Sequence, residues 1–310
     1  MKFEQVILIR SKTRLEQLID RFNTKAQAKF YIERSGGDFK VYEREHDIFY
    51  EEFNKLQKLL NVFPKYKVLD RSFLTNYLFN DYDLILVLGQ DGLVANTAKY
   101  VKGQPIVAFN PNPKAYDGAL LPFTVLQAKD LFNAIEKNTF KSNQITMAEA
   151  KFNDGQKLLA FNDFFIGPKT HVSARYKILF EGNEEIQSSS GVLVCTGAGS
   201  TGWMSSVFNM AKGIFDYHDQ VYDDFQKTLN WETNELMFAV REPFLSKVTG
   251  TTICFGKIRQ EKLKLESLMP EGGIIFSDGV EADAIPFNSG AIIEIGIAKE
   301  KANIITEYSK

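Results

Sequence analysis

The 310-residue sequence predicts an α/β N-terminal domain with a parallel sheet, followed by an all-β C-terminal domain. In the first half, short apolar runs alternate with segments of helical periodicity, which is typical of βαβ units. From about residue 144 onward, short β-type runs separated by turns take over. We therefore expect a Rossmann-like α/β domain at 1–142 and a β-rich domain at 143–310, whose last residues are free to return to the first domain.

The elements of the first half follow from periodicity. Uninterrupted apolar runs predict strands that are buried on both faces, as in a parallel sheet. These runs are residues 6–9, 84–88 and 105–109, and residues 66–69 are expected to form a further short strand. Apolar residues that recur every three or four positions predict helices. These segments are residues 14–32, 49–60, 93–100 and 128–136.

In the second half, Asn153-Asp154-Gly155 predicts a hairpin turn between strands at 147–152 and 157–161. A turn at 181–183 separates the strand-like runs 175–180 and 192–195. A helical segment with a polar, acidic tail interrupts the β pattern at 201–230. Further strands are expected at 237–240, 251–255, 262–265, 274–276 and 291–297.

Composition excludes several classes of protein. A formal net charge of -2 and the absence of a clearly basic face argue against a nucleic-acid partner. No apolar run has the length of a membrane span or of a signal sequence, so we expect a cytoplasmic protein without a membrane partner. Cys195 and Cys254 lie in apolar runs and are expected to be reduced core thiols. Three histidines argue against a histidine-rich metal site.

The strand at 84–88 ends abruptly in Gly89-Gln90-Asp91-Gly92, and a helical pattern follows at once. Open α/β sheets bind ligands at the carboxyl ends of such strands. A turn that only glycine accommodates easily would hold the Asp91 carboxylate there, ready to accept a proton from a substrate hydroxyl. Gly89 and Gly92 would let backbone amides approach phosphate oxygens. The structural alternative, which the motif alone favours equally, is that Asp91 caps the following helix.

A second glycine-rich turn follows the run at 192–195. Small and hydroxyl residues separate its glycines, so that open amides suit a phosphate or a base and hydroxyls suit a ribose. It lacks the Gly-Lys-Ser/Thr of a P-loop and, lying in the β-rich half, is not a Rossmann fingerprint. The alternative is tight packing alone, but such a dense run favours a ligand. The candidate ligand-binding residues are Thr196, Gly197, Gly199, Ser200, Thr201, Gly202 and Trp203.

A third segment places the polar pair Asn162-Asp163 inside the apolar run 161–167. Burying such a pair without partners costs a few kcal/mol. Either the pair makes an internal turn, or it offers an amide and a carboxylate to ribose hydroxyls.

Taken in order, these three segments resemble the NAD kinase family. The family carries a Gly-Gly-Asp-Gly motif, then an Asn-Glu pair, then an Asp-Gly stretch that ends in Ser-Thr-Pro-Thr-Gly-Ser-Thr-Ala-Tyr. Residues 89–92, 162–163 and 190–203 match these motifs with substitutions. The turn at 277–281 is similar to the family's late Val-Asp-Gly turn, so the resemblance spans most of the chain from about residue 83.

The resemblance implies an NAD kinase-like two-domain architecture with the active site between a Rossmann-like domain and a β-rich nucleotide-binding domain. It implies an ATP-dependent kinase that phosphorylates a ribose hydroxyl of NAD or a related nucleotide to give NADP, with Asp91 as general base. It assigns residues 162–163 to a ribose and 201–203 to the nucleotide. Mg²⁺ with ATP, and a homodimer or homotetramer, are also implied. Because the sequence shows no carboxylate cage, no protein metal ligands are assigned.

Departures from the family pattern indicate a divergent branch with an altered acceptor pocket. Ser190 replaces an aspartate and Gln90 replaces a glycine. Trp203 replaces a tyrosine, and its indole ring is the larger stacking surface. The alternatives are a kinase of another small hydroxyl substrate such as a sugar, and a non-catalytic nucleotide-binding protein, which Gln90 and Ser190 favour. The acceptor, and ATP against polyphosphate as the donor, stay open.

Overall fold

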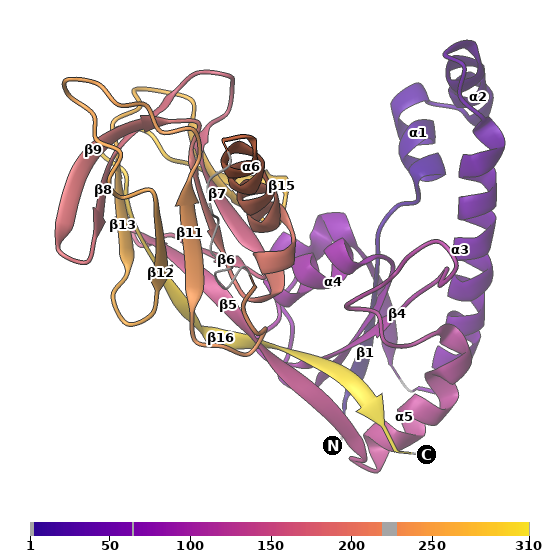
Figure 1. Cartoon of the computed structure of the whole chain (residues 1–310). Helices are drawn as coiled ribbons and strands as arrows, with labels where there is room; N and C mark the ends of the chain where they lie inside the picture. The colour runs from indigo at the N-terminus through magenta and orange to yellow at the C-terminus, as the bar shows by residue number, and fades with distance from the viewer. Residues whose placement is uncertain (1–2, 64, 219–227, 310) are drawn as a thin grey trace. The chain divides into compact units, whose positions relative to one another are not determined.

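The computed structural model describes residues 3–63, 65–218 and 228–309 (Figure 1). The chain divides into two compact units. Unit 1 comprises residues 1–143 and 303–310, and unit 2 comprises residues 144–302. Unit 1 is an α/β structure and unit 2 is mainly antiparallel β-structure, so the predicted fold class is confirmed.

Unit 1 is built on a parallel sheet with the strand order β2-β1-β3-β4-β16. All six residues of β3 are buried, because helices cover both faces of a parallel sheet. The last part of the chain joins this sheet, where Asn303 pairs with Pro105. The strands are β1 (Gln5–Arg10), β2 (Tyr66–Asp70), β3 (Asp83–Leu88), β4 (Pro105–Phe109) and β16 (Ile292–Tyr308).

Helices α3 and α5 pack on one face of this sheet. Phe53, Leu56 and Leu60 of α3 and Leu131 of α5 belong to the same buried apolar cluster as Leu86 of β3. Their apolar residues recur at helical spacing, so one face of each helix is buried. The helices of unit 1 are α1 (Arg14–Phe22), α2 (Lys25–Arg34), α3 (Phe39–Leu60), α4 (Asp91–Ala98) and α5 (Ala128–Glu136), with the 3₁₀ turns η1 (Arg71–Asn76) and η2 (Val125–Gln127).

The single helix expected at 14–32 is two helices, so that prediction is wrong. Asn23 takes a left-handed conformation with φ 63°, which ends α1, and the side chain of Thr24 then caps α2. Helix α3 begins at Phe39, ten residues before its expected start. We call α1, α2 and the N-terminal half of α3 the helical arm; Figure 1 shows its helices side by side, at the top right.

Unit 2 is a sandwich of two sheets. Its core contains Phe164, Val194 and Phe238 from one sheet and Tyr176 and Leu265 from the other. One sheet has the order β12-β11-β10-β7-β14-β15, and β8, β9 and β13 belong to the other, with β5, β6 and part of β16. The strands are β5 (Phe140–Phe152), β6 (Lys157–Ala160), β7 (Asp163–Pro168), β8 (Ala174–Phe180), β9 (Asn183–Ser189), β10 (Val192–Cys195), β11 (Leu236–Val240), β12 (Phe255–Ile258), β13 (Leu263–Ser267), β14 (Gly273–Ser277) and β15 (Val280–Pro286).

One helix, α6 (Trp203–Tyr217), covers part of the outer face of the β12–β15 sheet. Its Met204 and Phe208 pack on Leu193 and Met237 of that sheet. The expected helix at 201–230 is therefore shorter among the described residues, and most of its acidic tail lies outside them. In the described part of the chain no helix is long and apolar enough to cross a membrane.

Candidate functional site

The turn at 89–92 connects β3 directly to α4. Neither Gly89 nor Gly92 has a positive φ, so the expectation that only glycine conformations allow this turn is wrong. A Cβ at Gly89 would meet a terminal methyl of Leu93 at 2.8 Å, whereas a Cβ at Gly92 would meet no atom within 4 Å. Gln90 is the N-cap residue of α4 and its exposed side chain makes no capping hydrogen bond. The helix start therefore leaves backbone amides open at the carboxyl end of the sheet.

Asp91 is the first residue of α4 and does not cap it, so the capping alternative is wrong as well. Its carboxylate accepts hydrogen bonds from the backbone amides of Leu120 (2.8 Å) and Ala119 (3.2 Å). Both oxygens thus hold the loop that follows β4. Because each carboxylate oxygen has two lone pairs, acceptor capacity remains for a further partner.

The loop after β4 is ordered by Asn110. Its side chain donates to the Tyr116 carbonyl (3.0 Å) and accepts from the Asn112 amide (2.9 Å). Gly118 has a φ of 64° and leaves no room for a side chain beside the Asn110 amide. The loop therefore presents Asn112 and Tyr116 in a defined arrangement. Sequence reasoning missed both residues, although Asn110-Pro111-Asn112-Pro113 is a turn signal directly after a strand.

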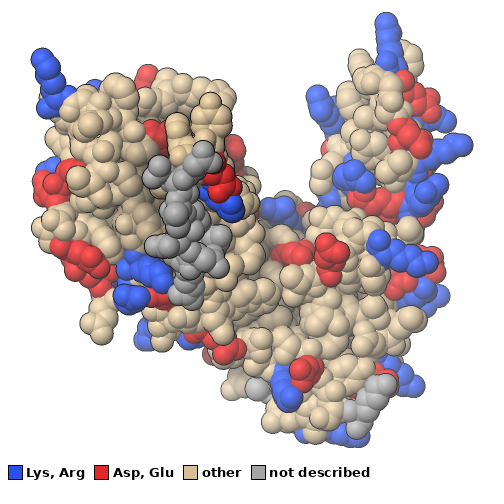
Figure 2. Space-filling model, in the orientation of Figure 1, with Lys and Arg blue, Asp and Glu red and all other residues tan. Residues whose placement is uncertain are grey.

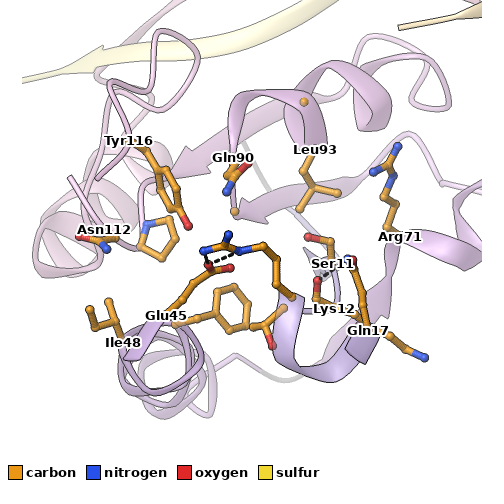
Figure 3. A pocket seen from close by; sticks show the side chains of 16 residues that line it. Ser11, Lys12, Gln17, Glu45, Ile48, Arg71, Gln90, Leu93, Asn112 and Tyr116 are labelled. Atoms are coloured by element: carbon orange, nitrogen blue, oxygen red, sulfur yellow. Dashed lines mark hydrogen bonds and ion pairs between the residues drawn. The ribbon is translucent and has the colours of Figure 1, made fainter. Parts of the chain in front are cut away.

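A pocket of about 260 Å³ lies at these strand ends, entirely within unit 1 (Figure 3). The segment 11–14 after β1 and Asn112 of the β4 loop line it, together with Arg71 after β2 and with Gly89, Gln90, Gly92 and Leu93. Figure 3 shows the side chains of Gln90, Glu45 and Tyr116 pointing toward its centre. Of the residues predicted to bind phosphate, the structure places Gly89 and Gly92 in this lining. Asp91 lies between them in the same turn but is not itself part of the lining.

Three basic residues line the pocket, and the sequence analysis missed all of them. Arg14 pairs with Glu45. The Lys12 ammonium pairs at 2.6 Å with Asp20, which does not line the pocket. The Nε of Arg71 donates to Asn96 at 3.2 Å, and Arg71 has no ion-pair partner among the described residues. Cations beside open helix amides can bind a phosphate-bearing ligand. The signal in the sequence was basic residues directly after predicted strands.

A polar network holds the connection between β1 and α1. Glu16 accepts hydrogen bonds from Arg10 (3.0 Å), the Tyr50 hydroxyl (2.7 Å) and the Thr13 amide (2.7 Å). Burial alone would raise the pKa of Glu16, but these donors outweigh it and lower that pKa to about 2. The segment that carries Lys12 and Arg14 into the pocket is therefore fixed at its base.

In unit 2, Asn162 and Asp163 stand at the start of β7. The carboxylate of Asp278, in the turn between β14 and β15, accepts from the amides of Asn162 (2.6 Å), Phe161 (3.1 Å) and Asp163 (3.3 Å). The backbone of the pair is thus satisfied internally, as the structural alternative expected. Their side chains hydrogen-bond to no described residue and stay available to a ligand.

Asp163 is only 8% exposed. Burial, and then the neighbouring carboxylate of Asp278, raise the pKa of Asp163 to about 7. Near neutral pH its carboxyl group can therefore carry a proton, so that it can donate a hydrogen bond as well as accept one.

The glycine-rich turn is mostly accounted for by packing. A Cβ at Gly197 would clash with the backbone of Asn230, and one at Gly199 would clash with the backbone of Asn162. Ser200 is buried; its hydroxyl donates to the Gly197 carbonyl (2.7 Å) and accepts from an amide of the neighbouring loop. These residues therefore shape the site and are not open to a ligand.

Thr196 is also buried; its hydroxyl donates to the Phe161 carbonyl (2.5 Å) and accepts from the Gly199 amide (3.2 Å). Thr201 and Gly202, by contrast, are exposed at the start of α6. Of the predicted ligand-binding run, the exposed residues are thus its last members, joined by half-buried Trp203.

Trp203 belongs to an aromatic cluster on unit 2. Its ring stacks on Phe165, with centroids 5.5 Å apart and planes 12° apart, and Phe276 follows at 5.2 Å from Phe165. The Arg241 guanidinium carbon lies 5.3 Å from the Trp203 centroid. A flat ring system beside a cation suits a nucleotide base and its phosphate.

No group of three or more histidine, cysteine, aspartate or glutamate side chains is placed to hold a metal ion in the parts of the chain that the structure describes. Cys195 and Cys254 are both free thiols, and burial raises the pKa of each. Cys195 is a core residue, as expected, whereas Cys254 is only half-buried.

No family model matches the chain. The NAD kinase of Saccharolobus solfataricus is 26% identical over 129 residues, which are 42% of this chain and 49% of that protein. The NAD kinase of Sulfurisphaera tokodaii is 32% identical over 135 residues, which are 41% of this chain and 49% of that protein. The chain thus spans about half the length of the relatives that it matches.

The solved structures match over nearly the whole chain. Yeast NADH kinase complexed with NADH has a TM-score of 0.61 at 13% identity, covering 98% of this chain and 84% of that one. The NAD kinase from Archaeoglobus fulgidus in complex with ATP has a TM-score of 0.55 at 15% identity, covering 97% and 92%. The fold is therefore that of these kinases, and about two fifths of this chain is similar in sequence to NAD kinases.

Proposed function

We propose that this chain is a phosphotransferase that moves the terminal phosphoryl group of a nucleoside triphosphate to a hydroxyl group of NAD, NADH or a related nucleotide. The observation that carries the proposal is the pocket of unit 1, where an open helix start and three basic residues lie at the ends of parallel strands. The matching NAD kinases, and the NADH and ATP complexes with a similar fold, support this choice of chemistry.

The donor would bind in this pocket. The amides at the start of α4 and the side chains of Lys12, Arg14 and Arg71 can neutralise its phosphates. Among the described residues that line it, the pocket has cations, open amides and one carboxylate, that of Glu45. This lining fits a Mg²⁺ ion that arrives with the phosphates. When bound, that ion would neutralise charge that develops on the transferred group.

The acceptor would bind to residues of unit 2. The free side chains of Asn162 and Asp163 can form hydrogen bonds with the hydroxyls of a ribose. Trp203 offers a stacking surface for a base, and the exposed residues Thr201 and Gly202 adjoin it. Gly197 is assigned a structural role in this proposal, because packing accounts for it.

In the proposed reaction the acceptor hydroxyl gives its proton to the Asp91 carboxylate. The hydroxyl oxygen forms the new bond to the γ-phosphorus, and the bond from that phosphorus to the bridging oxygen breaks. The nucleoside diphosphate leaves with the electron pair of the broken bond. Asp91 would then lose its proton to water.

A second candidate, a nucleotide-binding protein without turnover, is favoured by one observation. Both oxygens of Asp91 already serve the amides of Ala119 and Leu120. A carboxylate used only as such an anchor would leave the pocket able to bind a nucleotide but not to activate a hydroxyl.

One assay separates these candidates. The purified chain is incubated with ATP, Mg²⁺ and a panel of NAD, NADH, nucleosides and sugars, and the products are separated by chromatography. Formation of NADP or NADPH is the expected result. Another phosphorylated product would replace the acceptor in the proposal, and nucleotide binding without any product would favour the second candidate.

A further inference from the structure

The pocket of unit 1 has a wall that the parallel sheet does not supply. Arg14 comes from α1, and Glu45, Ile48 and Phe49 come from α3, so the helical arm closes one side of the pocket. The strand ends and α4 form the other sides. The arm is therefore part of the binding site and not an appendage beside it.

Within this wall, Arg14 is held by two contacts. Its guanidinium carbon lies 5.0 Å from the centroid of the Tyr42 ring, and its Nε donates to the Glu45 carboxylate at 2.5 Å. A second guanidinium nitrogen contacts the same carboxylate oxygen. Since a guanidinium has five N–H donors, several remain for a further anion.

The two partners differ in exposure. The Glu45 side chain is 17% exposed, whereas that of Arg14 is 53% exposed. An ion pair with one partner so exposed contributes little to stability, so breaking it costs little. A polyphosphate carries several negative charges and can outcompete one carboxylate for the same guanidinium.

From this arrangement we infer that Arg14 is a phosphate-binding residue of the donor pocket, and that Glu45 holds it in place until the phosphates displace the carboxylate. The inference rests on the proposed function for the identity of the donor, but its chemistry needs only a polyphosphate. Glu45 then sets the affinity, because a carboxylate in a phosphate pocket repels the ligand.

A second ion pair of the arm provides a matched control. Lys25 of α2 and Glu43 of α3 contact each other at 2.7 Å, and neither lines the pocket. Basic and acidic side chains are interspersed over the arm, at the upper right of Figure 2, so its charge as a whole does not favour anions. An effect confined to the Arg14 pair would therefore belong to the pocket.

The test is calorimetric titration of the full chain with Mg–ATP, tripolyphosphate and adenosine. Arg14→Gln, which keeps much of the aliphatic stem, should weaken the binding of ATP and tripolyphosphate by about tenfold and leave adenosine unchanged. Glu45→Gln should tighten both phosphate ligands by about threefold or more. Lys25→Gln and Glu43→Gln should change neither. A loss of folding cannot produce tighter binding, so the Glu45 variant guards against that explanation.

The inference is overturned if Arg14→Gln binds both phosphate ligands as the wild type does, if Lys25→Gln weakens them equally, or if the wild type binds neither. The proposed function fails separately. Tight phosphate binding with the expected response of both variants, but without any phosphorylated product, would overturn the proposed phosphotransferase activity. It would still support the phosphate-binding role of Arg14.

Discussion

At the scale of single residues, Asp91 combines two tasks that a substitution can separate. Its carboxylate holds the amides of Ala119 and Leu120, and in the proposed reaction it also accepts a proton. Asparagine keeps one oxygen for an amide but cannot take the proton of a hydroxyl at neutral pH. The structural task is therefore partly preserved in that variant, and the chemical task is lost.

We expect Asp91→Asn to lower turnover on the order of 10²-fold or more and to leave nucleotide affinity nearly unchanged. Steady-state kinetics and calorimetry on the same preparation measure the two effects. Asp130→Asn, at an exposed acid in the first turn of α5, is the control for charge at a helix start. Turnover like that of the wild type in the Asp91 variant would remove this residue from the mechanism.

Asp163 makes stability depend on pH. Its pKa is about 7 in the folded chain against an ordinary 3.8, so the folded state holds one more proton than the unfolded state between about pH 4 and pH 7. The free energy of unfolding should therefore fall by about 1.4 kcal/mol for each pH unit through this window as the pH rises. Asp163→Asn should lack this contribution. Urea denaturation from pH 4 to pH 8 tests it, and a constant difference between the two proteins would contradict it.

At the scale of elements, the turn between β10 and α6 depends on backbone packing. Gly199 lies so close to the Asn162 carbonyl oxygen that any side chain forces the two segments apart. Because β7 starts at the next residue, Asp163, such a shift would move the proposed acceptor residues with it.

Gly199→Ala should destabilise the chain by about 2 kcal/mol or more, because the clash is with backbone that cannot rotate away. Gly213→Ala is the matched control: it lies within α6, its Cβ would meet nothing within 4 Å, and a gain of up to about 1 kcal/mol is expected. Thermal unfolding of both variants makes the comparison. Equal effects would show that helix propensity, and not packing at Asn162, decides the outcome.

The β1–α1 connection should lose stability in acid. The pKa of Glu16 is lowered to about 2 from an ordinary 4.5, so its contribution to stability is complete above about pH 4.5 and is lost as the pH falls through 2. Glu16→Gln should therefore unfold more easily than the wild type at pH 6, with the gap narrowing toward pH 2. Circular dichroism during acid titration measures this, and a gap that persists at pH 2 would argue against the ionised group.

At the scale of the whole molecule, the last strand, β16, serves both units. Residues 292–302 of β16 belong to unit 2 and residues 303–308 to unit 1. Ile295 is buried in the sandwich core of unit 2, whereas Ile305 is buried beneath α3 and α5 of unit 1. The stability of unit 1 therefore depends on residues nearly 200 positions away from its fourth strand.

Ile305→Ala should cost about 2–5 kcal/mol, as is usual for a cavity at a fully buried isoleucine. Hydrogen exchange should speed up in β4 and β3 and much less in the strands of unit 2. Ile295→Ala, in the same strand, should show the reverse pattern. If both variants raise exchange equally in both units, the two units unfold as one, and the division of the strand has no energetic meaning.

The prediction succeeded where one residue pattern decides an element. The strands at 84–88 and 105–109 were predicted correctly because buried parallel strands are apolar without interruption. The prediction failed where contacts with a neighbouring strand decide whether an element forms. Strand β9 was missed because it is mostly polar. Its Gln187 can be buried because its side chain accepts a hydrogen bond from the Tyr176 hydroxyl of the neighbouring strand. No local pattern carries that information.

Local residue patterns were enough to predict the order of an α/β unit and a β unit, the Gly89–Gly92 turn at a strand end, and the resemblance to NAD kinases. The side chains that line the pocket, and their partners, follow from the way the chain folds in space. Arg14 meets Glu45 from another helix, and Asp91 meets the amides of a loop almost 30 residues later. The physical reason is that strands and helices follow from local periodicity, whereas the charge and shape of a pocket depend on side chains that are distant in sequence.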